Sequence, residues 1–194
     1  TVSISGFGDT GPYAQRPVYD PLIQGLSGLA TVQAGADELR PQLVRTILPD
    51  KLTGVTAAQA ITAALFARER TGESQHVRLS MLDAIIAFLW SSDMGSQTFV
   101  HSEVPQQEAA SLQDLIYETT TGYITIAVQS DREWQALIRA LNRPEWAEDP
   151  RFLNAKLRQE NIDARLELIQ SVIKTDTAEH WLARLEAEQV PCAP

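Results

Sequence analysis

The sequence of 194 residues is poor in the side chains on which several classes of protein depend. It has a single cysteine, Cys192, which has no partner for an internal disulfide and which we interpret as a small apolar residue. Its three histidines, His76, His101 and His180, lie far apart, and none has a neighbour at the spacing of metal ligands. We therefore expect no metal site.

Positive charge is also scarce, with 16 lysines and arginines against 25 aspartates and glutamates, a net charge of −9. This balance excludes the basic surface that nucleic acids and anionic lipids require. No apolar run approaches the ~18 residues that span a bilayer, and the N-terminus lacks the pattern of a signal peptide. We therefore expect a cytoplasmic protein with no nucleic-acid or membrane partner.

Hydrophobic residues make up 44% of the chain, which is typical of a globular protein, and their pattern differs between its two halves. In residues 1–100, predicted strands and predicted helices alternate along the chain. The patterns predict a strand at residues 2–5, a glycine- and proline-rich loop at 6–21, a helix from about Leu22, a strand or extended segment at 43–48, an alanine-rich helix from after Asp50 to Gly72, a strand at 75–79 and a helix from Ser80 to about Ser96. This order is typical of an α/β domain.

Residues 111–194 predict a small α+β domain. Segments 112–118 and 123–128 flank a turn and form a hairpin pattern. Ser130 and Glu133 have the spacing of a capping box, which opens a helix. A loop and two further helices follow. The polar segment 101–110 contains a proline and is the linker that we expect between the two domains.

Residues 6–11 read Gly-Phe-Gly-Asp-Thr-Gly, the literal G-x-G-x-x-G pattern of a dinucleotide-binding turn. Such a site requires a helix to begin within the motif, so that backbone N–H groups meet the pyrophosphate. Pro12 and Pro17 favour an extended loop instead. Two other interpretations are therefore favoured: a glycine turn that leaves a strand, or a loop that forms one wall of a substrate pocket.

Asp50 lies beside Pro49 at the predicted start of the alanine-rich helix. As a structural residue, it is an N-cap or first-turn carboxylate that the helix dipole stabilises. As a functional residue, it is an ionised carboxylate that attacks an activated acyl group, beside helix N–H groups that stabilise an oxyanion. The residue pattern alone leaves both interpretations open.

Seven segments, taken in order, resemble the class III CoA-transferase (CaiB/BaiF) family, which also contains 2-methylacyl-CoA racemases. They are residues 3–12 (SISGFGDTGP), 19–28 (YDPLIQGLSG), 50–54 (DKLTG), 63–72 (AALFARERTG), 80–84 (SMLDA), 149–152 (DPRF) and 190–194 (VPCAP). Each segment is moderately specific, whereas their order and spacing together are highly specific.

The resemblance implies that residues 1–100 are the closing part of a large nucleotide-binding-like α/β domain, and that residues 111–194 form most of a small α+β domain. It implies that Asp50 is the catalytic nucleophile, in a D-x-x-[SGT]-G setting. The substrate contacts that it implies are Gly6, Phe7, Gly8, Tyr19 and Gln24. It also implies a homodimer that acts on an acyl-CoA and a carboxylic acid, with coenzyme A present as the substrate thioester and with no metal.

Two alternatives accompany this hypothesis. Racemases of the family place a proton-moving histidine where this chain has Tyr19, and a phenol, which ionises near pH ~10, is poorly matched to that task. Transfer is therefore favoured over racemisation.

Family members are longer than this chain, so we expect most contacts to CoA to lie outside it and the chain alone to be inactive. The second alternative is a non-catalytic dimerisation fragment.

Overall fold

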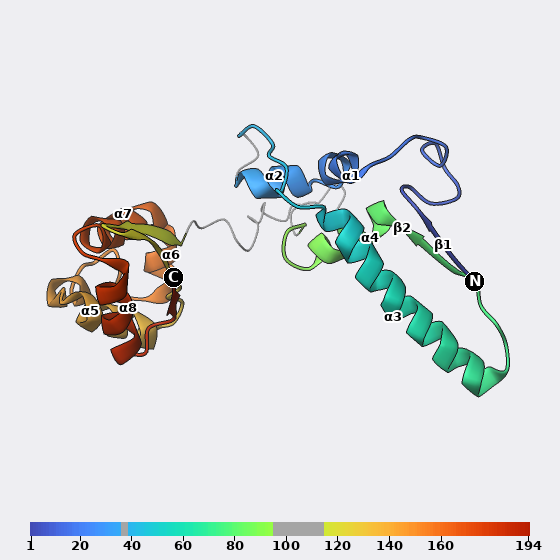
Figure 1. The fold of residues 1–194 in the computed structure, drawn as a ribbon. Coiled ribbons are helices and arrows are strands. Elements are labelled where there is room, and N and C mark those ends of the chain that lie inside the picture. The colour runs from blue at the N-terminus through green and yellow to red at the C-terminus, as the bar shows by residue number, and fades with distance from the viewer. Residues whose placement is uncertain (36–38, 95–114) are drawn as a thin grey trace. The chain divides into compact units, whose positions relative to one another are not determined.

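The computed structural model describes residues 1–35, 39–94 and 115–194 (Figure 1). The chain divides into two compact units, Thr1–Gln113 and Asp114–Pro194, which we call unit 1 and unit 2. Each unit has a hydrophobic core of its own. The linker predicted at residues 101–110 lies outside the described residues.

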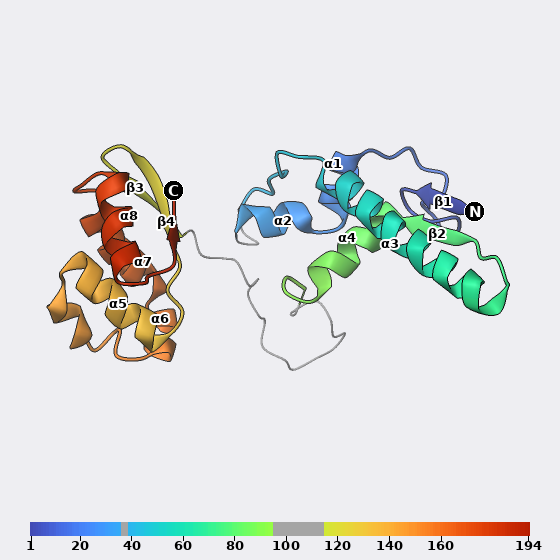
Figure 2. The same cartoon turned by 60° about the horizontal axis from the view of Figure 1, so that its bottom comes forward.

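Unit 1 is built on two parallel strands, β1 (Val2–Ser5) and β2 (Val77–Ser80). Parallel neighbours require a crossover connection. Here the crossover passes through α1 (Asp20–Leu26), α2 (Leu29–Ala34) and α3 (Leu48–Thr71), and α4 (Met81–Trp90) follows β2 directly. The helices α1 and α4 both contact α3 (Figure 2). The strands predicted at residues 2–5 and 75–79 are thus confirmed, the second with shifted ends.

The two ends of α3 have identifiable causes. Pro49 lies in the first turn, where the missing N–H removes no helical hydrogen bond. Gly72 ends the helix at φ +75°, and its N–H bonds the Arg68 carbonyl at 2.7 Å. The end at Gly72 was predicted, but the start was not. Residues 43–47 form no strand, and Asp50 lies inside the first turn rather than before it, because proline is accommodated there.

The core of unit 1 is small, and much of its apolar surface is exposed. The buried residues of its main cluster are Ile23, Leu29, Ile85 and Leu89. Large apolar side chains remain exposed along α3, namely Val55, Ile61, Leu65 and Phe66. A helix with apolar side chains on several sides is normally covered by other protein. Unit 1 therefore presents an apolar surface of the kind that forms interfaces.

Unit 2 contains a three-stranded antiparallel sheet of β3 (Ile116–Thr119), β4 (Gly122–Ile126) and β5 (Cys192–Ala193). Thr119 pairs with Gly122, which confirms the predicted hairpin. The edge strand β5 was not predicted, because two residues carry no readable alternation.

Helices pack on this sheet and enclose the larger core of the chain. They are α5 (Asp131–Leu141), the 3₁₀-helix η2 (Pro144–Ala147), α6 (Ala155–Glu160), α7 (Ile162–Ile173) and α8 (Ala178–Ala187). Trp134 is 1% exposed and its ring stacks on Trp146 at 6.2 Å between centroids. Helix α6 was not predicted, because six residues are too few to show a helical period.

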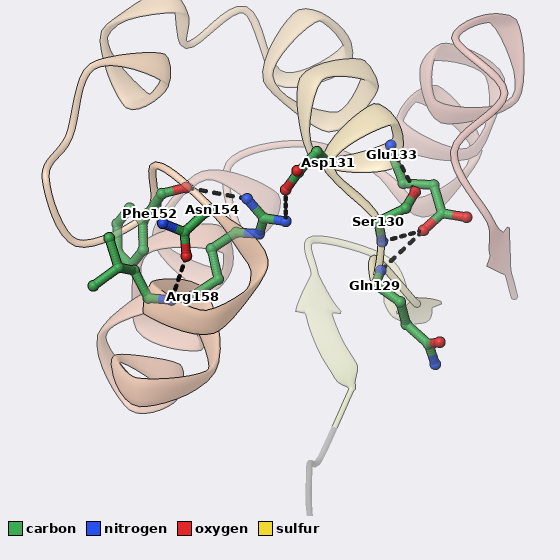
Figure 3. Close-up of polar contacts among 8 residues, drawn as sticks. Gln129, Ser130, Asp131, Glu133, Phe152, Asn154 and Arg158 are labelled. Atoms are coloured by element: carbon green, nitrogen blue, oxygen red, sulfur yellow. Dashed lines mark hydrogen bonds and ion pairs between the residues drawn. The ribbon is translucent and has the colours of Figure 1, made fainter.

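The N-terminus of α5 is held by a capping box (Figure 3). The Ser130 hydroxyl accepts from the Glu133 N–H at 3.2 Å, and the Glu133 carboxylate accepts from the N–H groups of Ser130 and Gln129, each at 2.9 Å. These backbone hydrogen bonds, that of Ser130 first, hold the pKa of Glu133 below its ordinary value. The capping box predicted from the sequence is confirmed.

A buried arginine ties α6 to the same end of α5 (Figure 3). The Arg158 side chain is 1% exposed. Its Nη2 donates to Asp131 Oδ1 at 2.5 Å and its Nη1 to the Phe152 carbonyl at 3.2 Å. The guanidinium also lies 5.6 Å from the Trp134 ring centroid. Asp131 is 70% exposed, so the desolvation cost of this pair falls on the arginine.

Because Arg158 is buried and Asp131 is exposed, we expect the loss of Asp131 to destabilise the fold more than the loss of Arg158. Asp131→Ala leaves a buried guanidinium without its carboxylate and should lower the free energy of unfolding by about 3 kcal/mol. Arg158→Met removes the buried charge and leaves a carboxylate that water can solvate, so it should cost about 1 to 2 kcal/mol. Urea unfolding, followed by tryptophan fluorescence, measures both. An equal or larger cost for Arg158→Met would contradict this account.

The capping box predicts a pH dependence. Because the pKa of Glu133 is lower in the folded than in the unfolded chain, its stabilisation is present above the ordinary value of 4.5 and is lost as the pH falls through the folded value. Glu133→Gln should therefore lower the urea midpoint at about pH 7 and lower it less at about pH 3. The same deficit at both pH values would show that ionised Glu133 contributes nothing.

Candidate functional site

Asp50 is the third residue of α3, and its side chain is exposed. Within the described part of the chain, no hydrogen bond or ion pair engages its carboxylate, although its own N–H is bonded. The dipole of α3 favours a negative charge at this end of the helix. Asp50 is thus an ionisable group with nothing in the described residues to neutralise it, which leaves it available to a ligand.

The first turn of α3 has no N–H group left to offer. Proline has none, and the others bond within the chain: Leu48 N–H to the Thr46 carbonyl at 2.9 Å, Asp50 N–H to Asp20 Oδ2 at 3.1 Å, and Lys51 N–H to the Ile47 carbonyl at 3.1 Å. The sequence interpretation that helix N–H groups beside Asp50 stabilise an oxyanion is therefore wrong for this turn. The helix dipole is the favourable influence on negative charge that remains at the Asp50 carboxylate.

Asp20 and Gln24 form a buried polar bridge between α1 and the start of α3. Asp20 is 4% exposed, and its Oδ1 accepts from Gln24 Nε2 at 2.6 Å while its Oδ2 accepts from the Asp50 N–H. Gln24 is 2% exposed, accepts from the Val44 N–H at 2.8 Å and donates to the Thr46 carbonyl at 3.1 Å. The bridge fixes where the helix with Asp50 begins.

The structure gives Gln24 and Asp20 roles that differ from those predicted from the sequence. Gln24 was predicted to contact the substrate, but it lies in the interior with its amide bonded within the chain. Asp20 was not singled out. The available signal was its place beside Tyr19 in the segment 19–28, where an aspartate before a proline looks like an ordinary helix start.

Thr53 and Gly54 complete the predicted D-x-x-T-G segment and face different environments. Thr53 is 3% exposed, and its hydroxyl donates to the Pro49 carbonyl at 2.7 Å. Gly54 lies four residues after Asp50, on the same face of the helix. A Cβ built at Gly54 meets no atom within 4 Å. Glycine inside a helix costs about 1 kcal/mol of stability relative to alanine. No packing contact in the described chain explains why position 54 has a glycine despite this cost.

The predicted residues of the first loop are held by contacts within unit 1. A Cβ on Gly6 would lie 2.2 Å from Val18 Cγ1, and Gly8 adopts φ +88°. Phe7 packs against the core cluster of unit 1, and its ring meets Tyr13 edge-on at 5.6 Å. These contacts explain the two glycines without a ligand. Phe7 joins the cluster against which Leu48 and Leu52, on either side of Asp50, also pack.

Tyr19 is the N-cap residue of α1 and is 78% exposed. It directly precedes Asp20, whose carboxylate points inward to the Asp50 N–H. The exposed residues Tyr19 and Asp50 are thus connected through Asp20, which follows Tyr19 in the chain and accepts the Asp50 N–H.

The described residues hold neither a cluster of metal ligands nor a membrane-spanning helix. Among residues 1–35, 39–94 and 115–194, no three histidine, cysteine or carboxylate side chains gather as metal ligands, and no helix is long and apolar enough to cross a membrane. A polar depression of about 370 Å³ lies on unit 2, where Arg139 and Glu188 pair at 2.7 Å. None of the predicted site residues lines it.

The sequence pattern of CoA-transferase family III matches residues 1–194. The acetyl-CoA:oxalate CoA-transferase of Acetobacter aceti is 31% identical over 99% of this chain and 50% of that protein. The succinate–glutarate CoA-transferase of Agrobacterium fabrum is 31% identical over 99% of this chain and 48% of that protein. The chain thus spans about half the length of these relatives.

Solved structures agree with this match. A CaiB/BaiF family protein from Brucella suis has a TM-score of 0.80 and 30% identity, covering 100% of this chain and 51% of that one. A hypothetical protein from Mycobacterium tuberculosis has a TM-score of 0.81 and 26% identity, covering 99% and 51%. The expected α/β fold is confirmed by these neighbours. The chain belongs to CoA-transferase family III.

Proposed function

We propose that the whole protein moves CoA from an acyl-CoA thioester to a small carboxylic acid, with Asp50 as the nucleophile. The observation that carries the proposal is the setting of Asp50. Its carboxylate is exposed and has no partner in the described chain, and its N–H is bonded to the buried Asp20 at the start of α3. Family membership supports CoA transfer in general. Two similar proteins carry the names of transferases for oxalate and for glutarate.

The first half of the proposed reaction loads CoA onto the protein. An Asp50 oxygen attacks the thioester carbonyl, the carbon–sulfur bond breaks, and CoA leaves as a thiolate while the acyl group and Asp50 form a mixed anhydride. The thiolate then attacks the Asp50 carbonyl carbon. This step releases the donor acid as a carboxylate and leaves CoA joined to Asp50 as a thioester.

The second half runs the same chemistry toward the acceptor. The acceptor carboxylate attacks the aspartyl thioester, which gives a second anhydride and the CoA thiolate. The thiolate attacks the acyl carbon of the acceptor and restores the Asp50 carboxylate. No step transfers a proton or changes an oxidation state, so the reaction needs an ionised Asp50 rather than a base beside it. The helix dipole supports that ionised form.

The other predicted contacts remain part of the proposal. We place the acyl group against the backbone of Gly6 and Gly8 and the side chains of Phe7 and Tyr19. The absent side chain at Gly54 leaves the space beside Asp50 open for the substrate. We also propose that the protein is cytoplasmic and that it forms a homodimer. The exposed apolar side chains of α3 support the homodimer.

Racemisation of a 2-methylacyl-CoA requires a base that removes the α-proton. No observation favours Tyr19 in that role, and transfer is the function we propose. Exchange of deuterium into the substrate α-carbon, without dependence on an acceptor acid, would reverse this choice.

Asp50→Asn in the whole protein should abolish CoA transfer, because an amide is a far weaker nucleophile than a carboxylate. Transfer is measured by mass spectrometry, with panels of acyl-CoA donors and carboxylic acids and detection of exchanged thioesters. Asp83→Asn is the matched control, since Asp83 is an exposed carboxylate in the first turn of α4. Transfer that persists in Asp50→Asn would overturn the proposed function.

Gly54→Ala should separate stability from activity. The added methyl group meets nothing within 4 Å and replaces a poor helix former, so unfolding should cost up to about 1 kcal/mol more. The same methyl group intrudes on the space beside Asp50, so kcat/KM should fall by about tenfold or more. Gly25→Ala, also open on α1, should leave kcat/KM unchanged. Full activity of Gly54→Ala would show that no substrate occupies that space.

A further inference from the structure

We propose that Asp20, together with Gln24, is a positioning residue that holds Asp50 in the orientation for attack on the thioester. The inference rests on the proposed role of Asp50 as the nucleophile. It follows from a buried hydrogen-bond network that ends on the N–H of Asp50 itself.

The network requires a carboxylate at position 20. Asp20 receives two donors on two different oxygens, Gln24 Nε2 at 2.6 Å and the Asp50 N–H at 3.1 Å. An asparagine places an NH2 group where one of these two oxygens stands, so that one donor faces another donor and is left unsatisfied. A buried carboxylate is costly unless such hydrogen bonds compensate for the lost water. Asp20, which is 4% exposed, therefore has one hydrogen-bond donor for each carboxylate oxygen, and these two hydrogen bonds compensate for its burial.

The bond to the Asp50 N–H also affects the Asp50 side chain. Aspartates near helix starts bond their own or neighbouring backbone N–H groups, which turns the carboxylate back onto the helix. Here Asp20 occupies the N–H of Asp50, and the remaining first-turn N–H groups bond backbone carbonyls. The N–H groups of the first turn are thus taken, and no hydrogen bond in the described chain turns the exposed Asp50 carboxylate back onto the helix.

Gln24 extends the control to the segment that precedes α3. Its amide exchanges hydrogen bonds with the backbone of Val44 and donates to the Thr46 carbonyl. The same Thr46 carbonyl accepts from the Leu48 N–H, the first of the helix. Gln24 therefore fixes the chain direction just before the helix begins, while Asp20 fixes the N–H two residues further on. A helix start held at both points resists the displacement of about 1 Å that costs rate.

The test uses Asp20→Asn and Gln24→Met in the whole protein. Ser27→Ala is the matched control, because Ser27 is a buried polar residue at the C-cap of α1. Its hydroxyl donates to the Gln24 carbonyl and accepts from the Leu29 N–H but does not bond Asp50. Active sites are counted by trapping the acylated enzyme with hydroxylamine. The rate per active site and the KM for acyl-CoA are then measured, so that unfolded molecules do not enter the comparison.

Both variants should lower kcat per active site by about tenfold or more while KM changes by less than about twofold, and Ser27→Ala should change neither. A purely structural role would lower the number of active sites and leave their kcat intact. If Asp50→Asn abolishes transfer but Asp20→Asn and Gln24→Met keep full kcat per site, the positioning role is overturned and the proposed function stands. If Asp50→Asn retains transfer, both are overturned.

Discussion

One hydrogen bond organises the first unit of this chain: the Asp20 carboxylate accepts from the N–H of Asp50. It joins α1 to α3 across 30 residues of sequence. Around it, Gln24 fixes the segment before α3, Thr53 bonds back to the Pro49 carbonyl, and Leu48 and Leu52 pack against the core. The nucleophile that we propose therefore stands on an exposed surface but is positioned by buried groups. Such support from rigid, hydrogen-bonded neighbours is what precise placement of a reacting atom requires.

The two units differ in how well they bury their own apolar side chains. Unit 2 encloses a broad core, and its helix ends are capped by side chains such as Ser130, Asn154 and Thr177. Unit 1 has a small core and leaves Val55 and Phe66 of α3 exposed. Exposed apolar surface of this kind is typical of interfaces, and the chain spans about half the length of its relatives. The proposed activity is accordingly assigned to the whole protein.

Sequence patterns predicted what depends on neighbouring residues and missed what depends on distant ones. The Ser130–Glu133 capping box and the helix end at Gly72 were readable because each involves one turn of chain. The burial of Gln24 and the importance of Asp20 arise from partners 20 to 30 residues away, which no local period reveals. The Asp50 N–H was misjudged for the same reason, because its acceptor Asp20 lies 30 residues away. Asp50 was predicted as the nucleophile through resemblance, since spacing alone favoured a structural interpretation and left the functional one open.

The central claim is that Asp50 carries the transferred group covalently. The most direct measurement is borohydride treatment of the whole protein during turnover with an acyl-CoA, followed by peptide mass mapping. An aspartyl thioester at position 50 is reduced to homoserine, and the account predicts that change in the peptide that contains Asp50 and only when acyl-CoA is present. An unmodified Asp50 peptide from enzyme that is turning over, or modification of a different carboxylate, would contradict it.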